Sequence, residues 1–251
     1  MPDYEMIEIG ADAGDARVRR MTLNRPDSRN AMSRRLVDEC LDWLDHAASD
    51  ESVGAILLAG AGRGFCAGSD LAGLAAMDDI GRSSFEADSG RLARAMMAHP
   101  RPIVAAVHGF AIGGGLTLAA ACDVVVTAPD AKWSLPEVPI GLFPAWGLEA
   151  VTLRVGGVRA RRLSWGIDML DGAGAAAIGL ADTVADDPFA EALAIARRLA
   201  ALPLAQSAAV KRYFAQARAG EAADAKANAL FMAACATPEA AARFEKYGKA
   251  G

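Results

Sequence analysis

The sequence predicts an α/β fold, with alternating strands and helices over residues 1–187 and a helical part over residues 188–251. Two observations carry this prediction. Short apolar, partly β-branched runs alternate with helical patterns in the first part, whereas only helical patterns occur in the second. Strand–helix alternation favours parallel pairing through right-handed crossovers. At 251 residues, the chain is long enough to bury a large core.

Five stretches of the first part have strand character. The first two surround a Gly-Asp turn, and the other three are apolar runs typical of buried core strands. The predicted strands are residues 5–9, 17–23, 53–59, 103–107 and 124–127.

The first helix is predicted after Ser33, whose hydroxyl can cap it. Its apolar side chains fall on one face, namely Leu36, Val37, Cys40, Leu41 and Leu44. Residues 72–98 begin as a polar, charge-mixed segment and continue as a helical run to Met97. This segment is compatible with a mobile lid and equally with an ordinary surface helix.

The second part contains four predicted helices. Pro203, Gly220 and Pro238 separate them, because proline and glycine interrupt helical structure. The helices cover residues 190–201, 205–217, 221–235 and 239–247.

Composition excludes several classes of protein. The formal net charge of −5 argues against nucleic-acid binding, which needs a basic face. No apolar run reaches the ~18 residues of a membrane span, and the acidic N-terminal residues are unlike a signal peptide. The four cysteines form no Cys-x-x-Cys pair and lie among small or apolar residues, so we expect reduced thiols. The sequence therefore predicts a cytoplasmic protein without nucleic-acid or membrane partners.

The chain has few candidates for metal binding. Its three histidines are His46, His99 and His108, and no two of them have metal-ligand spacing. We therefore expect neither a metal nor a redox cofactor.

Two glycine-rich loops follow predicted strands. Gly113, Gly114 and Gly115 precede an apolar helix, whose N-terminal N–H groups and dipole suit a negative oxygen. These glycines are also compatible with tight packing alone. The second loop ends at Ser69 and Asp70, either of which can cap a helix near Leu71. Two such strand ends can supply two backbone donors to one oxyanion.

Glu137 is the strongest candidate for acid–base chemistry. It lies in an apolar stretch with three prolines, residues 133–144. Burial there would raise the pKa of the carboxyl group towards neutrality, as suits a general base. A capping or ion-paired glutamate is the alternative.

Four blocks of this sequence resemble the crotonase superfamily, that is, the enoyl-CoA hydratase/isomerase family. Their order and spacing match over nearly the whole chain. The blocks are NRPDSRNAM at 24–32, FCAGSDL at 65–71, the glycines 113–115 with Cys-Asp at 122–123, and LPEVPIGLFP at 135–144. The resemblance implies a spiral of ββα units. It also implies a helical C-terminal part that covers the site and builds a homotrimer, or a hexamer of two trimers.

The resemblance implies an acyl-CoA substrate, with CoA as part of the substrate and no separate cofactor. Glu137 would be the catalytic acid/base, and the Ser69 and Gly114 N–H groups would bind the thioester oxygen. The implied substrate- or CoA-binding residues are Arg29, Ala67, Ser69, Asp70, Leu71, Ala72, Gly114, Thr117, Ala145, Trp146, Phe244 and Lys246.

Two positions depart from the family pattern. Thr117 stands where family hydratases carry a second glutamate, and a hydroxyl is too weak a base near pH 7. Trp146 adds bulk to a block that is usually Pro-Gly-Ala-Gly-Gly, and it either restricts the pocket or packs in the core. Isomerisation and hydration of an enoyl-CoA therefore rank close together, and Thr117 favours isomerisation or an unusual reaction.

Other readings remain open at this point. They are a non-catalytic or RNA-binding crotonase homologue, and another crotonase reaction such as decarboxylation or thioester hydrolysis. A serine hydrolase using Ser69 lacks the Gly-x-Ser-x-Gly elbow. A nucleotide-binding module lacks the Gly-x-Gly-x-x-Gly fingerprint.

Overall fold

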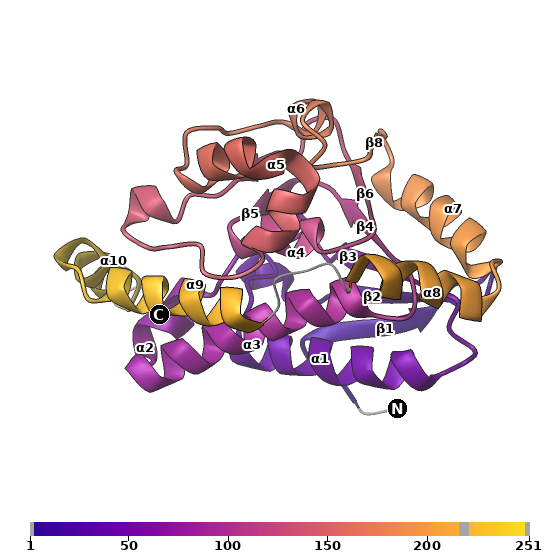
Figure 1. Ribbon diagram of the computed structural model, residues 1–251, viewed down its shortest axis with the longest axis horizontal. Helices are drawn as coiled ribbons and strands as arrows, with labels where there is room; N and C mark the ends of the chain where they lie inside the picture. Colours follow the sequence, from indigo (N-terminus) through magenta and orange to yellow (C-terminus); the bar gives the residue numbers. More distant parts are fainter. Residues whose placement is uncertain (1–2, 216–220, 249–251) are drawn as a thin grey trace.

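The computed structural model describes residues 3–215 and 221–248, and its main feature is a six-stranded sheet of order β1-β2-β3-β4-β6-β8 (Figure 1). β1 pairs antiparallel with β2, and all other pairs in this sheet are parallel. The five predicted strands correspond to β1, β2, β3, β4 and β6. The strands are β1 Ile7–Ala11, β2 Val18–Leu23, β3 Ala55–Gly60, β4 Ile103–Val107, β6 Val124–Thr127 and β8 Thr183–Val184.

A second layer of short strands alternates along the chain with strands of the main sheet. β5 (Phe110–Ile112) pairs in parallel with β7 (Lys132–Ser134). Isolated bridges extend this layer between Met32 and Ser69, Cys66 and Ala111, and Trp133 and Leu170. The chain thus passes through the main sheet, then the second layer, then a helix, and repeats. This is the ββα spiral that the resemblance implies.

Helices surround these two layers. Ser33 caps α1 as predicted, since its Oγ accepts a hydrogen bond from the Leu36 N–H at 3.2 Å. The helices are α1 Arg34–Ser49, α2 Leu71–Ala76, α3 Asp79–Ala98, α4 Gly114–Ala120, α5 Leu148–Ser164, α6 Gly172–Ala177, α7 Pro188–Ala200, α8 Leu204–Ala215, α9 Glu221–Cys235 and α10 Pro238–Gly248. Residues 216–217 of one predicted helix and Gly220 lie outside the described residues.

The sheet is covered on both faces. The larger apolar core lies between the sheet, the second layer and helices that include α1, α3 and α4. A smaller cluster on the other face joins sheet residues such as Leu57 and Val104 to Ala192, Ala196 and Ala200 of α7. Figure 1 shows α7 apart from α9 and α10.

The other C-terminal helices lie beside α2 and α3. α8 and α9 pack against α3, and α10 packs against α2 (Figure 1). α3 itself buries Phe85, Leu92 and Met96, so the segment that could have been a lid is a packed helix. The division of the chain at residue 187 stays a prediction.

Among the described residues, no single helix is long and apolar enough to cross a membrane. α7 and α8 reach that length and composition only as a pair, and the pair is bent by 108°.

Candidate active site

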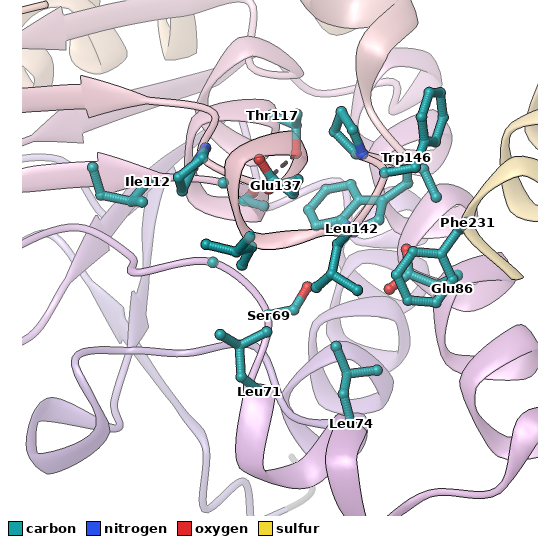
Figure 2. Close-up of a pocket in the computed structure, with 18 of the residues that line it drawn as sticks. Ser69, Leu71, Leu74, Glu86, Ile112, Thr117, Glu137, Leu142, Trp146 and Phe231 are labelled. Atoms are coloured by element: carbon teal, nitrogen blue, oxygen red, sulfur yellow. Dashed lines mark hydrogen bonds between the residues drawn. The ribbon is translucent and has the colours of Figure 1, made fainter. Parts of the chain in front are cut away.

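One cavity of about 70 Å³ lies where the two glycine loops meet the loop that follows β7 (Figure 2). Its walls come from residues far apart in the sequence. α3 and α9 each contribute one residue, Glu86 and Phe231. Eight predicted site residues line the cavity: Ala67, Ser69, Leu71, Gly114, Thr117, Glu137, Ala145 and Trp146.

The two glycine loops contact each other closely. Gly68 has a φ of +90°, and a Cβ built on it would lie 2.8 Å from the Ile112 carbonyl oxygen and 3.1 Å from the Gly114 nitrogen. A Cβ on Gly115 would lie 2.2 Å from the Cys66 carbonyl oxygen. Glycine is therefore required here for close backbone approach. The same packing brings residues 68–69 beside the start of α4.

The Ser69 and Gly114 amides remain available at this junction. In the described ranges 3–215 and 221–248, neither N–H group donates a hydrogen bond to a protein acceptor. Both residues line the cavity, and Gly114 is the first residue of α4. Fixed, unpaired N–H donors that face one cavity can stabilise a negative oxygen that develops there.

Glu137 lies directly against the first of the three glycines. A Cβ on Gly113, whose φ is +55°, would lie 2.6 Å from Glu137 Oε1. The other carboxyl oxygen, Oε2, is buried and has no hydrogen-bond partner among the described residues. Burial raises the pKa of Glu137 to about 7. Glu137 precedes the 3-10 helix Val138–Ile140, but its side chain accepts no capping bond.

The hydroxyl group of Thr117 has a structural hydrogen bond rather than a role in acid–base chemistry. Its side chain is buried, and Oγ1 donates a hydrogen bond to the Gly114 carbonyl oxygen at 3.0 Å (Figure 2). The position of a Cβ on Gly147 lies only 2.4 Å from Thr117 Cβ, so this side chain also supports the chain turn before α5. The hydroxyl therefore ties the first turn of α4 together.

Trp146 belongs to the cavity wall and to the core at once. It is 4 % exposed, and a Cβ on Gly114 would lie 2.6 Å from its Cζ2. Figure 2 shows Trp146 among the side chains that line the cavity. The two interpretations of this tryptophan thus both apply, and the ring narrows the cavity beside Gly114.

Five predicted binding residues do not line the cavity, and their roles stay predictions. Arg29 is exposed with a φ of 54°, and Ala72 and Lys246 are also exposed. Asp70 caps α2 and forms an ion pair with Arg25 at 3.0 Å.

The fifth of these residues, Phe244 on α10, is 8 % exposed. The guanidinium group of Arg82 lies 4.4 Å from the centre of its ring. One face of the ring is therefore occupied by a cation–π contact, rather than open for stacking on an adenine.

Sequence reasoning missed Glu86, which lines the cavity from α3 and is 4 % exposed. Burial, together with the charge of Glu137, raises the pKa of Glu86 to about 8. A signal existed in the sequence, since Glu86 precedes Gly90 and Ala93 by four and seven residues. All three belong to the buried stripe of α3.

The residues that line the cavity include two with carboxyl groups, Glu86 and Glu137, and two with hydroxyl groups, Ser69 and Thr117. Within the part of the chain that the structure describes, no group of three or more His, Cys, Asp or Glu side chains could hold a metal ion.

The spiral, the two glycine loops and the buried carboxyl group define a class of protein. A crystal structure of an enoyl-CoA hydratase/isomerase from Mycobacterium paratuberculosis matches this fold with a TM-score of 0.89 at 30% identity. The match covers 98% of this chain and 100% of that one. The fold is therefore that of the crotonase class.

The sequence comparisons narrow the class to a family. The family described as "Enoyl-CoA hydratase/isomerase" matches residues 13–242. A protein of Bacillus subtilis named "Probable enoyl-CoA hydratase" is 36% identical over 66% of this chain and 65% of its own length. A "Probable enoyl-CoA hydratase" of Mycobacterium tuberculosis is 38% identical over 70% of each chain. The chain belongs to the enoyl-CoA hydratase/isomerase family.

Proposed function

We propose that this protein is an enzyme that acts on an acyl-CoA thioester through an enolate. The observation that carries the proposal is that one cavity is lined by a buried carboxyl group and by two residues whose backbone N–H groups donate to no acceptor in the described part of the chain. The Ser69 and Gly114 N–H groups bind the thioester oxygen, where negative charge develops when a carbon-bound proton leaves. CoA is part of the substrate.

Glu137 transfers the proton. Its pKa of about 7 means that the carboxylate form is abundant near neutral pH, while the acid form remains a good donor. In an isomerisation, the carboxylate removes a proton from C2 of a 3-enoyl thioester. The electron pair moves onto the thioester oxygen. Return of the proton to C4 then gives the 2-enoyl thioester, so that atoms and charge balance.

Isomerisation is preferred over hydration because of Thr117. Hydration of a conjugated double bond needs water activation as well as proton transfer at the α-carbon. The Thr117 hydroxyl group donates its hydrogen bond to the Gly114 carbonyl oxygen, and the Trp146 ring narrows the cavity beside Gly114. Hydration remains the second candidate, since relatives of this chain are named as probable hydratases.

A panel of 2-enoyl- and 3-enoyl-CoAs tests this proposal. Chromatography with mass spectrometry separates isomerised products from products that have gained water, and free CoA reports thioester hydrolysis. We expect conversion of 3-enoyl-CoA and weak hydration of crotonyl-CoA. A crotonyl-CoA hydration kcat well above ~10 s⁻¹, which is typical of enzymes, would reverse the ranking. Acyl-CoA binding without turnover of any member would support a non-catalytic homologue.

A further inference from the structure

Glu86 is a buried carboxyl group of the candidate site that has no partner among the residues the structure describes. Its residue exposure is 4 %, and it lines the cavity. Across residues 3–215 and 221–248, no group donates a hydrogen bond to it and no cation pairs with it. Burying such a group costs free energy unless a ligand or water bonds to it.

The polar neighbours of Glu86 on α3 are engaged elsewhere. Arg82, one turn earlier, donates to the Leu74 and Ala75 carbonyl oxygens and pairs with Asp79. Ser83 accepts hydrogen bonds from Asn228 of α9, which ties the two helices together. The chain therefore offers a cation and an amide nearby, yet neither one neutralises or satisfies Glu86.

The surroundings of Glu86 are those of an acyl-binding wall. Leu74, Leu142 and Phe231 line the same cavity. Figure 2 shows Glu86 beside Phe231 on one side of the cavity, with Glu137 and Thr117 on the other. An acyl group held by its thioester oxygen at Ser69 and Gly114 could thus extend towards Glu86, away from Glu137.

The protonation state of Glu86 limits what it can bind. Its pKa is raised to about 8 by burial and by the charge of Glu137, so the carboxyl group is mostly neutral at pH 7. A neutral carboxyl group has one O–H donor and retains acceptor capacity. Such a group suits a hydroxyl or carbonyl oxygen. A carboxylate on the acyl chain would instead add a negative charge beside Glu86 and Glu137.

We propose that Glu86 is a specificity-determining residue that hydrogen-bonds an oxygen substituent on the acyl group of the substrate. The site then selects hydroxy- or oxo-substituted acyl-CoAs over hydrocarbon acyl-CoAs of equal length. This inference rests on the proposed acyl-CoA function. A site built to hydrogen-bond a substrate oxygen discriminates strongly against the analogue that lacks it, because its own polar group is then left unpaired.

Binding of unreactive, saturated acyl-CoAs tests the inference without requiring turnover. Calorimetry would compare butyryl-, hexanoyl- and octanoyl-CoA with their ω-hydroxy and oxo counterparts. We expect at least one oxygen-substituted member to bind about tenfold or more tightly than its hydrocarbon partner. Glu86→Leu should abolish or reverse this preference, and Glu86→Gln should keep much of it, because an amide still donates and accepts.

Ser89→Ala is the matched control. Ser89 lies one turn further along α3, is fully buried, and does not line the cavity, and its Oγ has no partner within the described residues. The Ser89→Ala variant should keep the preference for oxygen-substituted acyl-CoAs. Thermal melts of all variants would show whether each one folds. If Glu86→Leu does not fold, Glu86→Met, which has a similar length and no strong hydrogen-bonding group, replaces it against the same pairs and should lose the preference.

Three results would overturn the inference. The unmodified protein could bind hydrocarbon chains as tightly as every substituted one. Glu86→Leu could retain the preference. Glu86→Leu and Glu86→Gln could both lower kcat equally for all substrates with KM unchanged, which would place Glu86 at the reacting centre. Absence of binding to any acyl-CoA would refute the proposed function itself, and this inference with it.

Discussion

Two carboxyl groups in one cavity have raised pKa values for the same main reason. Burial destabilises the charged form of both Glu86 and Glu137, and the charge of Glu137 raises the pKa of Glu86 further. Near pH 7, Glu137 is therefore present both as the carboxylate and as the carboxylic acid, while Glu86 is mostly the neutral acid. This separation suits a proton-transferring group beside a hydrogen-bonding group.

Glu137→Gln should keep the fold and acyl-CoA binding but lower kcat by roughly two or more orders of magnitude, because the amide cannot accept the proton. In the unmodified protein, kcat for proton abstraction should rise as pH increases through about 7. Steady-state kinetics on the substrate found in the enoyl-CoA panel would measure both effects. Near-normal turnover of the variant would remove Glu137 from the mechanism.

The oxyanion donors should respond differently to substitution. Ser69→Ala should cost little, since the donor is the backbone N–H. Gly114→Ala should be severe, because its Cβ would lie 2.6 Å from Trp146 Cζ2 and the ring or the helix start must move. Loss of one good donor corresponds to about 3 kcal/mol of transition-state stabilisation, measured as kcat/KM.

The double variant Gly114→Ala/Trp146→Phe tests this explanation. The smaller phenyl ring removes the clash with the new Cβ, so activity should recover in part. Recovery of activity would tie the defect to displaced geometry. A severe, fold-neutral defect in Ser69→Ala would instead mean that the hydroxyl group takes part directly.

The site was predictable wherever its chemistry is local in sequence. Glu137 stands in an apolar, proline-rich stretch, and the glycines precede a helix, so both were found from their neighbours. Glu86 was not found, because its role depends on α9 and the loop after β7 closing over α3. The position of Trp146 over Gly114 is likewise a product of tertiary packing.

At the scale of elements, α8 is held by a polar anchor. Lys211 is the buried residue of this helix, and its Nζ donates to the Met96 and Arg101 carbonyl oxygens and to Asp123 Oδ2 at 2.6 Å. Asp123 in turn accepts a hydrogen bond from the Ile103 N–H at 2.7 Å, at the start of β4. The anchor thus joins α8 to the sheet.

Lys211→Met should lower the free energy of unfolding by about 1–3 kcal/mol, because two carbonyl oxygens and a carboxylate each lose a donor while most of the side-chain length is kept. Urea denaturation would measure the change. Arg212→Met, an exposed residue of the same helix, is the control and should have little effect. Equal loss in both variants would contradict the anchor.

Element prediction failed for the shortest strands and for the docking of α7. β5 and β7 have three residues each and β8 has two, too few for a periodic pattern. The alternation of strands and helices predicted the parallel sheet, since crossovers require it. Nothing in the spacing of alanines in α7 indicates whether they meet the sheet or another helix.

At the scale of the whole molecule, the raised carboxyl pKa values make stability depend on pH. Both groups have an ordinary pKa of 4.5, so the unfolded chain loses their protons first as pH rises. The folded protein keeps them until about pH 7 and 8. Their contribution to stability is thus complete below pH 4.5 and is lost as pH rises towards 8.

Glu86→Gln should therefore reduce the fall in the free energy of unfolding between pH 5 and 8, measured by urea titrations. Buried His99 has a lowered pKa and contributes a slope of opposite sign, but it is common to both proteins and cancels in the comparison. Restricting the range to pH 8 keeps the cysteine thiols out of the comparison. If the free energy of unfolding changed with pH equally in both proteins, the raised pKa of Glu86 in the folded state would be contradicted.

Assembly is expected from the exposed apolar side chains. Trp165, Ile167 and Met169 follow or end α5, and Tyr213 and Phe214 lie on α8, with exposures of 52–75 %. Together with the family resemblance, this predicts a homotrimer or a hexamer of two trimers. Sedimentation velocity at micromolar concentration would measure it, and a stable, active monomer would refute it.

The close packing of α7 on the sheet has a consequence for biosynthesis. The helix meets the sheet so tightly that a Cβ on Gly54 would lie 2.8 Å from the Ala200 carbonyl oxygen. Val18, Leu57 and Val104 share that face of the sheet. A ribosome makes all of these strands long before it reaches residue 200. Any part of this sheet face that forms before α7 emerges lacks its apolar cover, so this side of the fold can be completed only late in translation.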